Sequence, residues 1–186
     1  EALPLVFAGN PKKVMDIGAN TGKFTLACLD YNKDVEVGLV DLLVQLNVAK
    51  ENIEDAGYGN RVQYFERNML DKQTVLPTGY DIIWMSQFLD CFADDEIVTI
   101  LEKCHQALDE NGRVFINETF WDRQRFEASA LSLQMTSLYF TTMANGNSQM
   151  YDSKVFLGLI EKAGFEVVAD HNDIGLSHTI LELKKK

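Results

Sequence analysis

The sequence is 186 residues long, 46% hydrophobic and 24% charged, which is the profile of one folded domain with a substantial core. Its net charge of −11 argues against a nucleic-acid backbone or an anionic membrane as the main partner. No apolar run reaches the roughly 18 residues that indicate a membrane span. Cys28, Cys91 and Cys104 have neither zinc nor disulfide spacing, so reduced thiols and a cytoplasmic location are expected.

Strand-like and helix-like segments alternate along the chain. Short apolar runs predict strands over 13–17, 35–40, 61–66, 81–86 and 113–117. Helical spacing and glycine stops predict helices over 21–30, 42–56, 94–108, 126–143 and 153–163. Segments 165–169 and 178–183 are expected to form a terminal strand pair. This order predicts an α/β, Rossmann-like, doubly wound and mostly parallel seven-stranded sheet with an antiparallel C-terminal strand.

A glycine-rich turn joins the first predicted strand to the first predicted helix. Its sequence is Asp16-Ile17-Gly18-Ala19-Asn20-Thr21-Gly22. Gly18 allows a sharp turn, Asn20 tolerates a positive φ, and Gly22 allows a ligand or a neighbouring backbone to come close. Asp41 ends the next strand, where an acidic side chain can accept hydrogen bonds from ribose hydroxyls. The sequence therefore predicts a nucleoside-binding site at the carboxyl edge of the sheet.

Nicotinamide dinucleotides and S-adenosylmethionine bind to similar turns, and the acidic residue that precedes the first glycine, Asp16, distinguishes the two kinds of site. An anion at Asp16 would be unfavourable beside a pyrophosphate, but favourable beside the ammonium or sulfonium of S-adenosylmethionine. The tight Gly-x-Gly-x-x-Gly pattern of dehydrogenases is also missing. Both observations favour S-adenosylmethionine and leave a nicotinamide-dependent oxidoreductase as a weaker alternative.

With these residues in place, the chain resembles the catalytic domain of the hydroxyindole- and caffeate-type O-methyltransferases, a class I methyltransferase family. Asp16-x-Gly18-x-x-x-Gly22 matches the cofactor loop of that family, with Asn20 where the family usually has glycine. Asp41-Leu42-Leu43 resembles its Asp-Leu-Pro sequence. The resemblance implies that this loop, Asp41 and Leu42 bind S-adenosylmethionine.

Further matches follow in the same order as in the family. Asn68-Met69-Leu70 stands where the family has Gly-Asp-Met-Phe, so Asn68 and Met69 are expected to hold the adenine. The block 81–96 resembles the fourth strand and the next helix, and Ser86 at the end of that strand is included in the predicted cofactor site. Glu118 falls where the family has an active-site glutamate. Ala163-Gly164-Phe165 matches the family near the C-terminus.

The resemblance also implies a part that the sequence does not contain. Members of the family usually carry an N-terminal helical domain, which forms a homodimer and closes the substrate pocket. Residues 1–186 are therefore expected to be the catalytic domain of a longer protein. The implied partner is a small-molecule methyl acceptor.

Asp90 is the main departure from the family pattern. The family uses a histidine as general base after the fourth strand, and an ungapped count from Asp81 places Asp90-Cys91-Phe92 there. A phenol has a pKa near 10, so a base assists its methylation, but aspartate, with a reference pKa of about 3.9, is a weak base. The neighbouring apolar side chains could raise the pKa of Asp90. Asp90 and Glu118 are the predicted catalytic residues.

Other interpretations of Asp90 stay open. Its carboxylate could bind a cationic or hydroxylated group of the substrate, or it could cap the helix that starts near Ala93. Loss of the histidine also keeps open a non-catalytic relative that uses the same fold as a binding module. Methyl transfer to a hydroxyl oxygen is the favoured function, and transfer to carbon or nitrogen is a variant of it.

The segment 126–143 is long, apolar and rich in methionine. Core packing is expected for most of its apolar side chains. Because this region lines the acceptor pocket in the family, Met135 and Phe140 are predicted to contact an aromatic acceptor. No histidine has a metal-ligand spacing, so no metal is expected.

Overall fold

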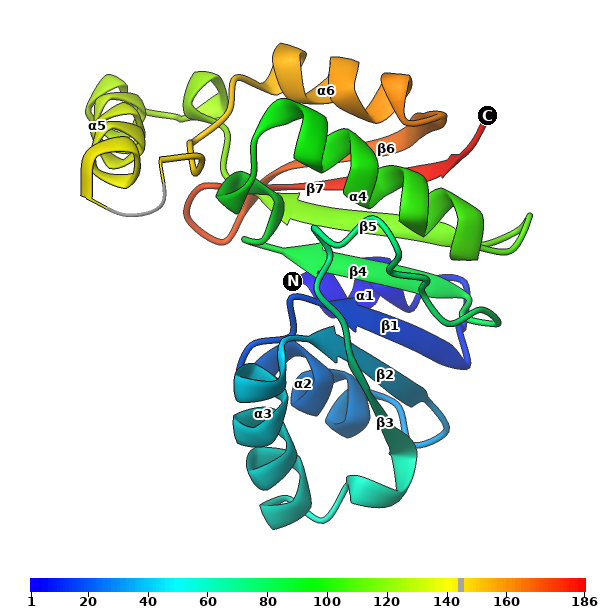
Figure 1. Ribbon diagram of the computed structural model, residues 1–186. Helices are drawn as coiled ribbons and strands as arrows, with labels where there is room; N and C mark the ends of the chain where they lie inside the picture. Colours follow the sequence, from blue (N-terminus) through cyan, green and yellow to red (C-terminus); the bar gives the residue numbers. More distant parts are fainter. Residues whose placement is uncertain (144–145) are drawn as a thin grey trace.

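A computed structural model describes residues 1–143 and 146–186 as a seven-stranded sheet flanked by helices (Figure 1). The strands are β1 (Lys13–Ile17), β2 (Glu36–Asp41), β3 (Val62–Glu66), β4 (Ile82–Ser86), β5 (Arg113–Glu118), β6 (Phe165–Ile174) and β7 (His178–Lys185). Their order is β3-β2-β1-β4-β5-β7-β6, and β7 pairs antiparallel to both of its neighbours. The predicted fold class is confirmed.

Helices connect the strands and cover both faces of the sheet. The α-helices are α1 (Ala2–Val6), α2 (Lys23–Tyr31), α3 (Leu43–Asp55), α4 (Asp94–Ala107), α5 (Glu127–Met143) and α6 (Ser153–Lys162). Three 3₁₀ turns are η1 (Gly59–Arg61), η2 (Leu89–Cys91) and η3 (Trp121–Arg123). Figure 1 shows α4 and α6 on one face, and α2 and α3 on the other.

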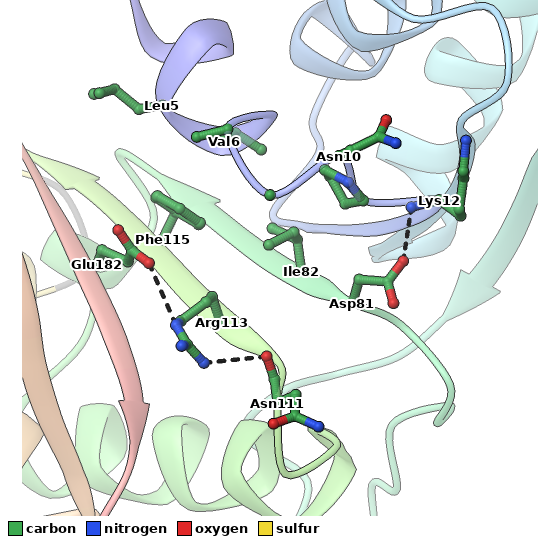
Figure 2. Close-up of a pocket in the computed structure, with 13 residues that line it drawn as sticks. Leu5, Val6, Asn10, Lys12, Asp81, Ile82, Asn111, Arg113, Phe115 and Glu182 are labelled. Carbon is green, nitrogen blue, oxygen red and sulfur yellow. Dashed lines mark hydrogen bonds and ion pairs between the residues drawn. The ribbon is translucent and has the colours of Figure 1, made fainter.

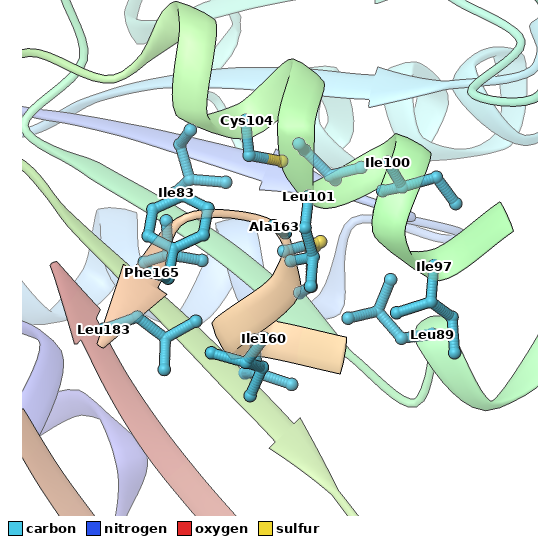
Figure 3. Close-up of a cluster of buried hydrophobic side chains, with 14 of the residues drawn as sticks. Ile83, Leu89, Ile97, Ile100, Leu101, Cys104, Ile160, Ala163, Phe165 and Leu183 are labelled. Atoms are coloured by element: carbon cyan, nitrogen blue, oxygen red, sulfur yellow. The ribbon is translucent and has the colours of Figure 1, made fainter. Parts of the chain in front are cut away.

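The larger apolar core lies between the sheet and the α4–α6 face. On α4, the buried Ile97, Ile100, Leu101 and Cys104 repeat at helical spacing and face the sheet. Figure 3 shows these side chains meeting those of α6 and of the strands, including Phe165. A second cluster packs α1, α2 and α3 against the opposite face. Two cores on one sheet fix its carboxyl edge as a rigid platform.

β1 and β4 are adjacent parallel strands. The chain continues from β1 to β2 on one side and from β4 to β5 on the other, so the strand order reverses between β1 and β4. Such a reversal opens a crevice at the carboxyl ends of the strands. The loops after β1, β2, β4 and β5 meet at this edge, and they carry most of the residues that the sequence singled out. The fold therefore places the candidate site at this switch point.

Helix α5 contradicts the expectation of core packing. None of its residues is buried, and Figure 1 shows it projecting beyond the end of the sheet. Its most exposed apolar side chains are Leu131, Met135, Leu138, Tyr139 and Met143. The apolar stretch predicted the helix correctly but not its surroundings, because its polar and apolar residues are mixed around the helix and form no separate faces that show which side meets solvent. No helix in the described ranges is long and apolar enough to cross a membrane.

Candidate functional site

The loop between β1 and α2 has the backbone geometry that its sequence predicted. Gly18, Asn20 and Gly22 have positive φ angles of 72°, 50° and 76°. The N–H of Gly18 donates to the carbonyl of Val40 at 2.9 Å, which ties the loop to the end of β2. A side chain on Gly22 would come within 3.3 Å of Ala49 on α3. The glycines thus let the loop turn tightly between two neighbouring elements.

Asp41 connects this loop to the start of α3. One of its carboxylate oxygens accepts the N–H of Asn20 at 2.8 Å, and the other accepts the N–H of Leu42 at 2.7 Å. The Asp41 residue remains partly exposed. Because each carboxylate oxygen can accept a second hydrogen bond, Asp41 keeps acceptor capacity for a diol at the surface. Its orientation is set before any ligand binds.

Asp16 lies beneath the same loop and is only 2% exposed. Its carboxylate accepts the hydroxyl hydrogen of Thr25 on α2 at 2.7 Å. Burial raises the pKa of Asp16 to about 7, with a smaller contribution from the nearby charge of Asp41. The sequence led us to expect Asp16 beside a bound cation. The structure shows an interior carboxyl group that holds α2 to β1, and direct contact with a ligand stays a prediction.

The raised pKa of Asp16 predicts how folding stability depends on pH. The folded state keeps the Asp16 proton up to about pH 7, whereas the unfolded chain loses it near the ordinary aspartate pKa of 3.8. The folded state therefore binds more protons in this range, and stability should fall as pH rises from 4 to 7. We expect Asp16→Asn to remove on the order of 2–4 kcal/mol of this fall.

Urea unfolding of both proteins at intervals from pH 4 to pH 7.5 measures this difference. An unchanged slope in Asp16→Asn would show that Asp16 titrates at its ordinary pKa despite its burial.

Glu118 organises the turn that follows β4. One carboxylate oxygen accepts the N–H groups of Phe88 (3.0 Å) and Leu89 (2.9 Å), and the other accepts the side-chain N–H of Gln87 (3.1 Å). Gln87 adopts a positive φ of 48°, so the chain turns abruptly there. Burial and the neighbouring Asp90 raise the pKa of Glu118 well above its ordinary value. Glu118 therefore fixes the backbone from which Asp90 projects.

Asp90 is 7% exposed, and its carboxylate accepts a weak hydrogen bond from the thiol of Cys91 at 3.6 Å. Burial raises its pKa, as the sequence suggested. The interpretation of Asp90 as a helix cap is wrong. Residue 93 is the N-cap of α4, and Glu96 reaches back to accept the Ala93 N–H at 2.8 Å. Within the described part of the chain, no salt bridge joins Asp90 or Glu118 to a basic residue.

Ser86 accepts a hydrogen bond from the amide of Asn117 at 2.8 Å, across the carboxyl ends of β4 and β5. The side-chain oxygen of Asn117 is buried and has no hydrogen-bond partner among the described residues. Sequence reasoning missed Asn117, although its position next to Glu118 at a strand end could have indicated it. A buried acceptor without a partner at this edge is a natural contact for a ligand or an ordered water.

The remaining predicted residues lie in two other segments. Asn68 is exposed and closes a local turn by accepting the N–H of Leu70 at 3.0 Å, whereas the Met69 side chain is buried in the core. Lys103 of α4 donates to the carbonyl of Met69 and holds this loop against the sheet. Met135 is 51% exposed on α5. Asn68 and Met69 as adenine contacts, and Met135 as an acceptor contact, stay predictions.

Phe140 on α5 is partly exposed and packs against the ring of Tyr139 at a centroid distance of 5.9 Å. Its predicted contact with an acceptor also stays a prediction. Among the described residues, no group of three histidine, cysteine or acidic side chains could hold a metal ion.

A cavity of about 380 Å³ lies at the opposite, amino edge of the sheet, next to α1 (Figure 2). Val6, Ile82 and Phe115 form its apolar wall, and Arg113 pairs with Glu182 at 3.3 Å on another side. Because its lining comes from the starts of β4 and β5, this cavity is remote from the glycine-rich loop and is not part of the candidate site.

The switch-point loop, the acidic end of β2 and the acidic turn after β4 lie together at the carboxyl edge of a Rossmann-like sheet, where domains of this architecture bind their ligands. The family model described as an O-methyltransferase domain matches residues 7–166, and the chain belongs to this family.

Curated relatives include an L-tyrosine C(3)-methyltransferase of Streptomyces lavendulae, 24% identical over 153 residues, which span 82% of this chain and 41% of that protein. A demethylspheroidene O-methyltransferase of Rhodobacter capsulatus is 26% identical over 91% of this chain and 40% of its own length. The chain thus spans less than half the length of these relatives. The solved structure of a mitomycin 7-O-methyltransferase superposes with a TM-score of 0.84 at 23% identity, over 97% of this chain and 50% of that one.

Proposed function

We propose that this chain binds S-adenosylmethionine and forms the catalytic domain of an enzyme that methylates a hydroxyl oxygen of a small molecule. The observation that carries the proposal is the pairing of the β1–α2 loop with Asp41. Family membership and the similarity to a structure solved with S-adenosylmethionine and a hydroxynaphthoic acid support it. That structure has a TM-score of 0.79 at 24% identity, over 94% of this chain and 49% of the other.

The residues present fit this cofactor. Asp41 offers oriented acceptors for the ribose hydroxyls, and Leu42 presents a half-exposed apolar side chain beside it for the adenine. The loop at Gly18 and Asn20 passes between Asp41 and the turn after β4, where Ser86 and the unpartnered Asn117 oxygen add polar contacts. When bound, S-adenosylmethionine supplies an electrophilic methyl group.

In this proposal, the acidic turn after β4 binds and activates the methyl acceptor. The raised pKa of Asp90 brings its carboxylate closer to the basicity that proton removal from a hydroxyl requires. Glu118 is a positioning residue, because it holds the N–H groups of Phe88 and Leu89 and thereby orients Asp90. The partial burial of this turn excludes water, which favours transfer to the acceptor over side reactions.

Asp90→Asn tests the catalytic part of the proposal. We expect turnover to fall by about 100-fold or more, because general-base catalysis contributes on this scale, with the affinity for S-adenosylhomocysteine unchanged. The measurement is formation of S-adenosylhomocysteine from S-adenosylmethionine with an acceptor found in a screen of phenols. Asp109→Asn, a change at an exposed aspartate, is the control. Unchanged turnover in Asp90→Asn would rule out a base at this position.

We also propose that residues 1–186 act within a longer, cytoplasmic and homodimeric protein, whose N-terminal domain closes the acceptor site. The greater length of the relatives and the exposed apolar side chains of α5 support this arrangement. The buried thiols of Cys28 and Cys104 support a reducing compartment. Analytical ultracentrifugation of the full-length protein, compared with that of residues 1–186, tests the proposed homodimer. A monomeric full-length protein would contradict it.

A further inference from the structure

Lys103 on α4 is a buried lysine, with only 7% of its surface exposed. Burying a cation costs free energy unless the charge is paired, and no carboxylate in the described ranges forms a salt bridge with Lys103. Its ammonium group instead donates to the carbonyl oxygens of Met69 at 2.5 Å and of Asp71 at 2.7 Å. The polar contacts of this buried charge in the described chain are thus with a single loop.

That loop follows β3 and begins next to the proposed ribose site. Strand β3 is the neighbour of β2, and Asp41 and Glu66 are paired in register at the ends of the two strands. The N–H of Arg67 donates to the carbonyl of Asp41 at 3.0 Å. Figure 1 shows the chain running on from β3 toward the face of the sheet that α4 covers. The loop is therefore tied to Asp41 at its start and to Lys103 further on.

The peptide groups on both sides of Met69 are fixed. The carbonyl of Asn68 accepts the N–H of Asp71 at 3.1 Å and the hydroxyl hydrogen of Thr74 at 2.7 Å. The carbonyl of Met69 accepts the ammonium group of Lys103, and the Met69 side chain is buried in the core. The backbone N–H of Met69 has no acceptor among the residues that the structure describes. Because such groups are rarely left unpaired in a buried residue, this N–H is a natural donor to a ligand.

We infer that Lys103 is a positioning residue for the adenine base, because it holds Met69 so that the backbone N–H of Met69 donates to the ring nitrogen N1 of adenine. The inference rests on the proposed function and on the predicted contact of Met69 with the base. N1 of adenine is a hydrogen-bond acceptor, whereas N1 of hypoxanthine carries a hydrogen. A fixed N–H donor at this place therefore favours adenine and rejects hypoxanthine.

Calorimetric titration with S-adenosylhomocysteine and with S-inosylhomocysteine, which carries hypoxanthine in place of adenine, tests the inference. We expect the wild type to bind S-adenosylhomocysteine at least about tenfold more tightly, the scale of a lost hydrogen bond that leaves its donor unpaired. Lys103→Met keeps an unbranched side chain of similar length and removes the donors. It is expected to weaken binding of S-adenosylhomocysteine about tenfold and to reduce the preference to less than about threefold.

Two matched variants separate positioning from a purely structural role. Loss of a structural contact would lower the free energy of unfolding but leave the ratio of the two dissociation constants as in the wild type. Lys103→Arg keeps a cationic donor and should retain most of the preference for adenine. Lys162→Met, at an exposed lysine of α6, is the control and should behave as the wild type does.

If Lys103→Met does not fold, Lys103→Gln takes its place with the same expectation, because its shorter, uncharged side chain does not hold both carbonyl groups. An unchanged preference in the folded variant, or no preference in the wild type, would overturn the inference. Failure of the wild type to bind S-adenosylhomocysteine would instead contradict the proposed function, so the two failures are distinct.

Discussion

Replacing Asp41 with alanine is expected to weaken binding of S-adenosylhomocysteine by about 100-fold. The change removes the proposed acceptors for the two ribose hydroxyls, and hydrogen bonds to a charged group contribute about 1.5–3 kcal/mol. It also removes the acceptors of the N–H groups of Asn20 and Leu42, so the loop loses its preset shape. Calorimetric titration gives the dissociation constant directly.

Asp41→Asn separates these two effects. An asparagine keeps one oxygen acceptor but loses the charge, so we expect an intermediate loss of about tenfold. Glu51→Ala, an exposed acidic residue on α3, is the control for net charge and should bind normally. An unchanged affinity in Asp41→Ala would show that the ribose does not bind at the end of β2.

Gly18→Ala is expected to damage both folding and cofactor binding. An added Cβ would lie 2.4 Å from the ring of Phe88, and the φ of +72° is itself unfavourable for alanine. The left-handed backbone costs roughly 1–2 kcal/mol and overpacking typically adds 1–3 kcal/mol. We therefore expect a loss of about 2–4 kcal/mol in the free energy of unfolding, together with loss of measurable cofactor binding.

Three further variants separate the backbone strain from the ring contact. Gly57 has a φ of +81°, and nothing lies within 4 Å of its added Cβ, so Gly57→Ala measures the backbone cost alone. In a Phe88→Ala background, Gly18→Ala should cost little more than Gly57→Ala does. Urea unfolding of the wild type, Gly18→Ala, Gly57→Ala, Phe88→Ala and the double variant Gly18→Ala/Phe88→Ala gives these differences. A Gly18→Ala variant as stable as Gly57→Ala would contradict the close contact between the loop and Phe88.

The strands and most helices could be predicted to within a few residues, because buried strands and glycine stops leave local signals. β6 is longer than predicted and runs on to Ile174, since it pairs with β7 through two register irregularities that no local pattern encodes. α1 and η2 were missed because elements this short have too little periodicity. The exposed surroundings of α5 depend on which elements pack beside it, and periodicity does not contain that information.

The parts of the candidate site that could be predicted from the sequence are those whose shape is set within one short segment. The turn from Asp16 to Gly22 and the acidic end of β2 are of this kind. The contact of Phe88 with Gly18 and the pair formed by Ser86 and Asn117 join residues distant in sequence, so only the folded chain shows them.

Calorimetric titration of this chain with S-adenosylhomocysteine, with NADH as the control ligand, tests the central claim most directly. We expect micromolar binding of S-adenosylhomocysteine and no binding of NADH. Binding of NADH in its place, or of neither ligand by this chain and by the full-length protein, would contradict the claim that the switch-point loop and Asp41 form an S-adenosylmethionine site.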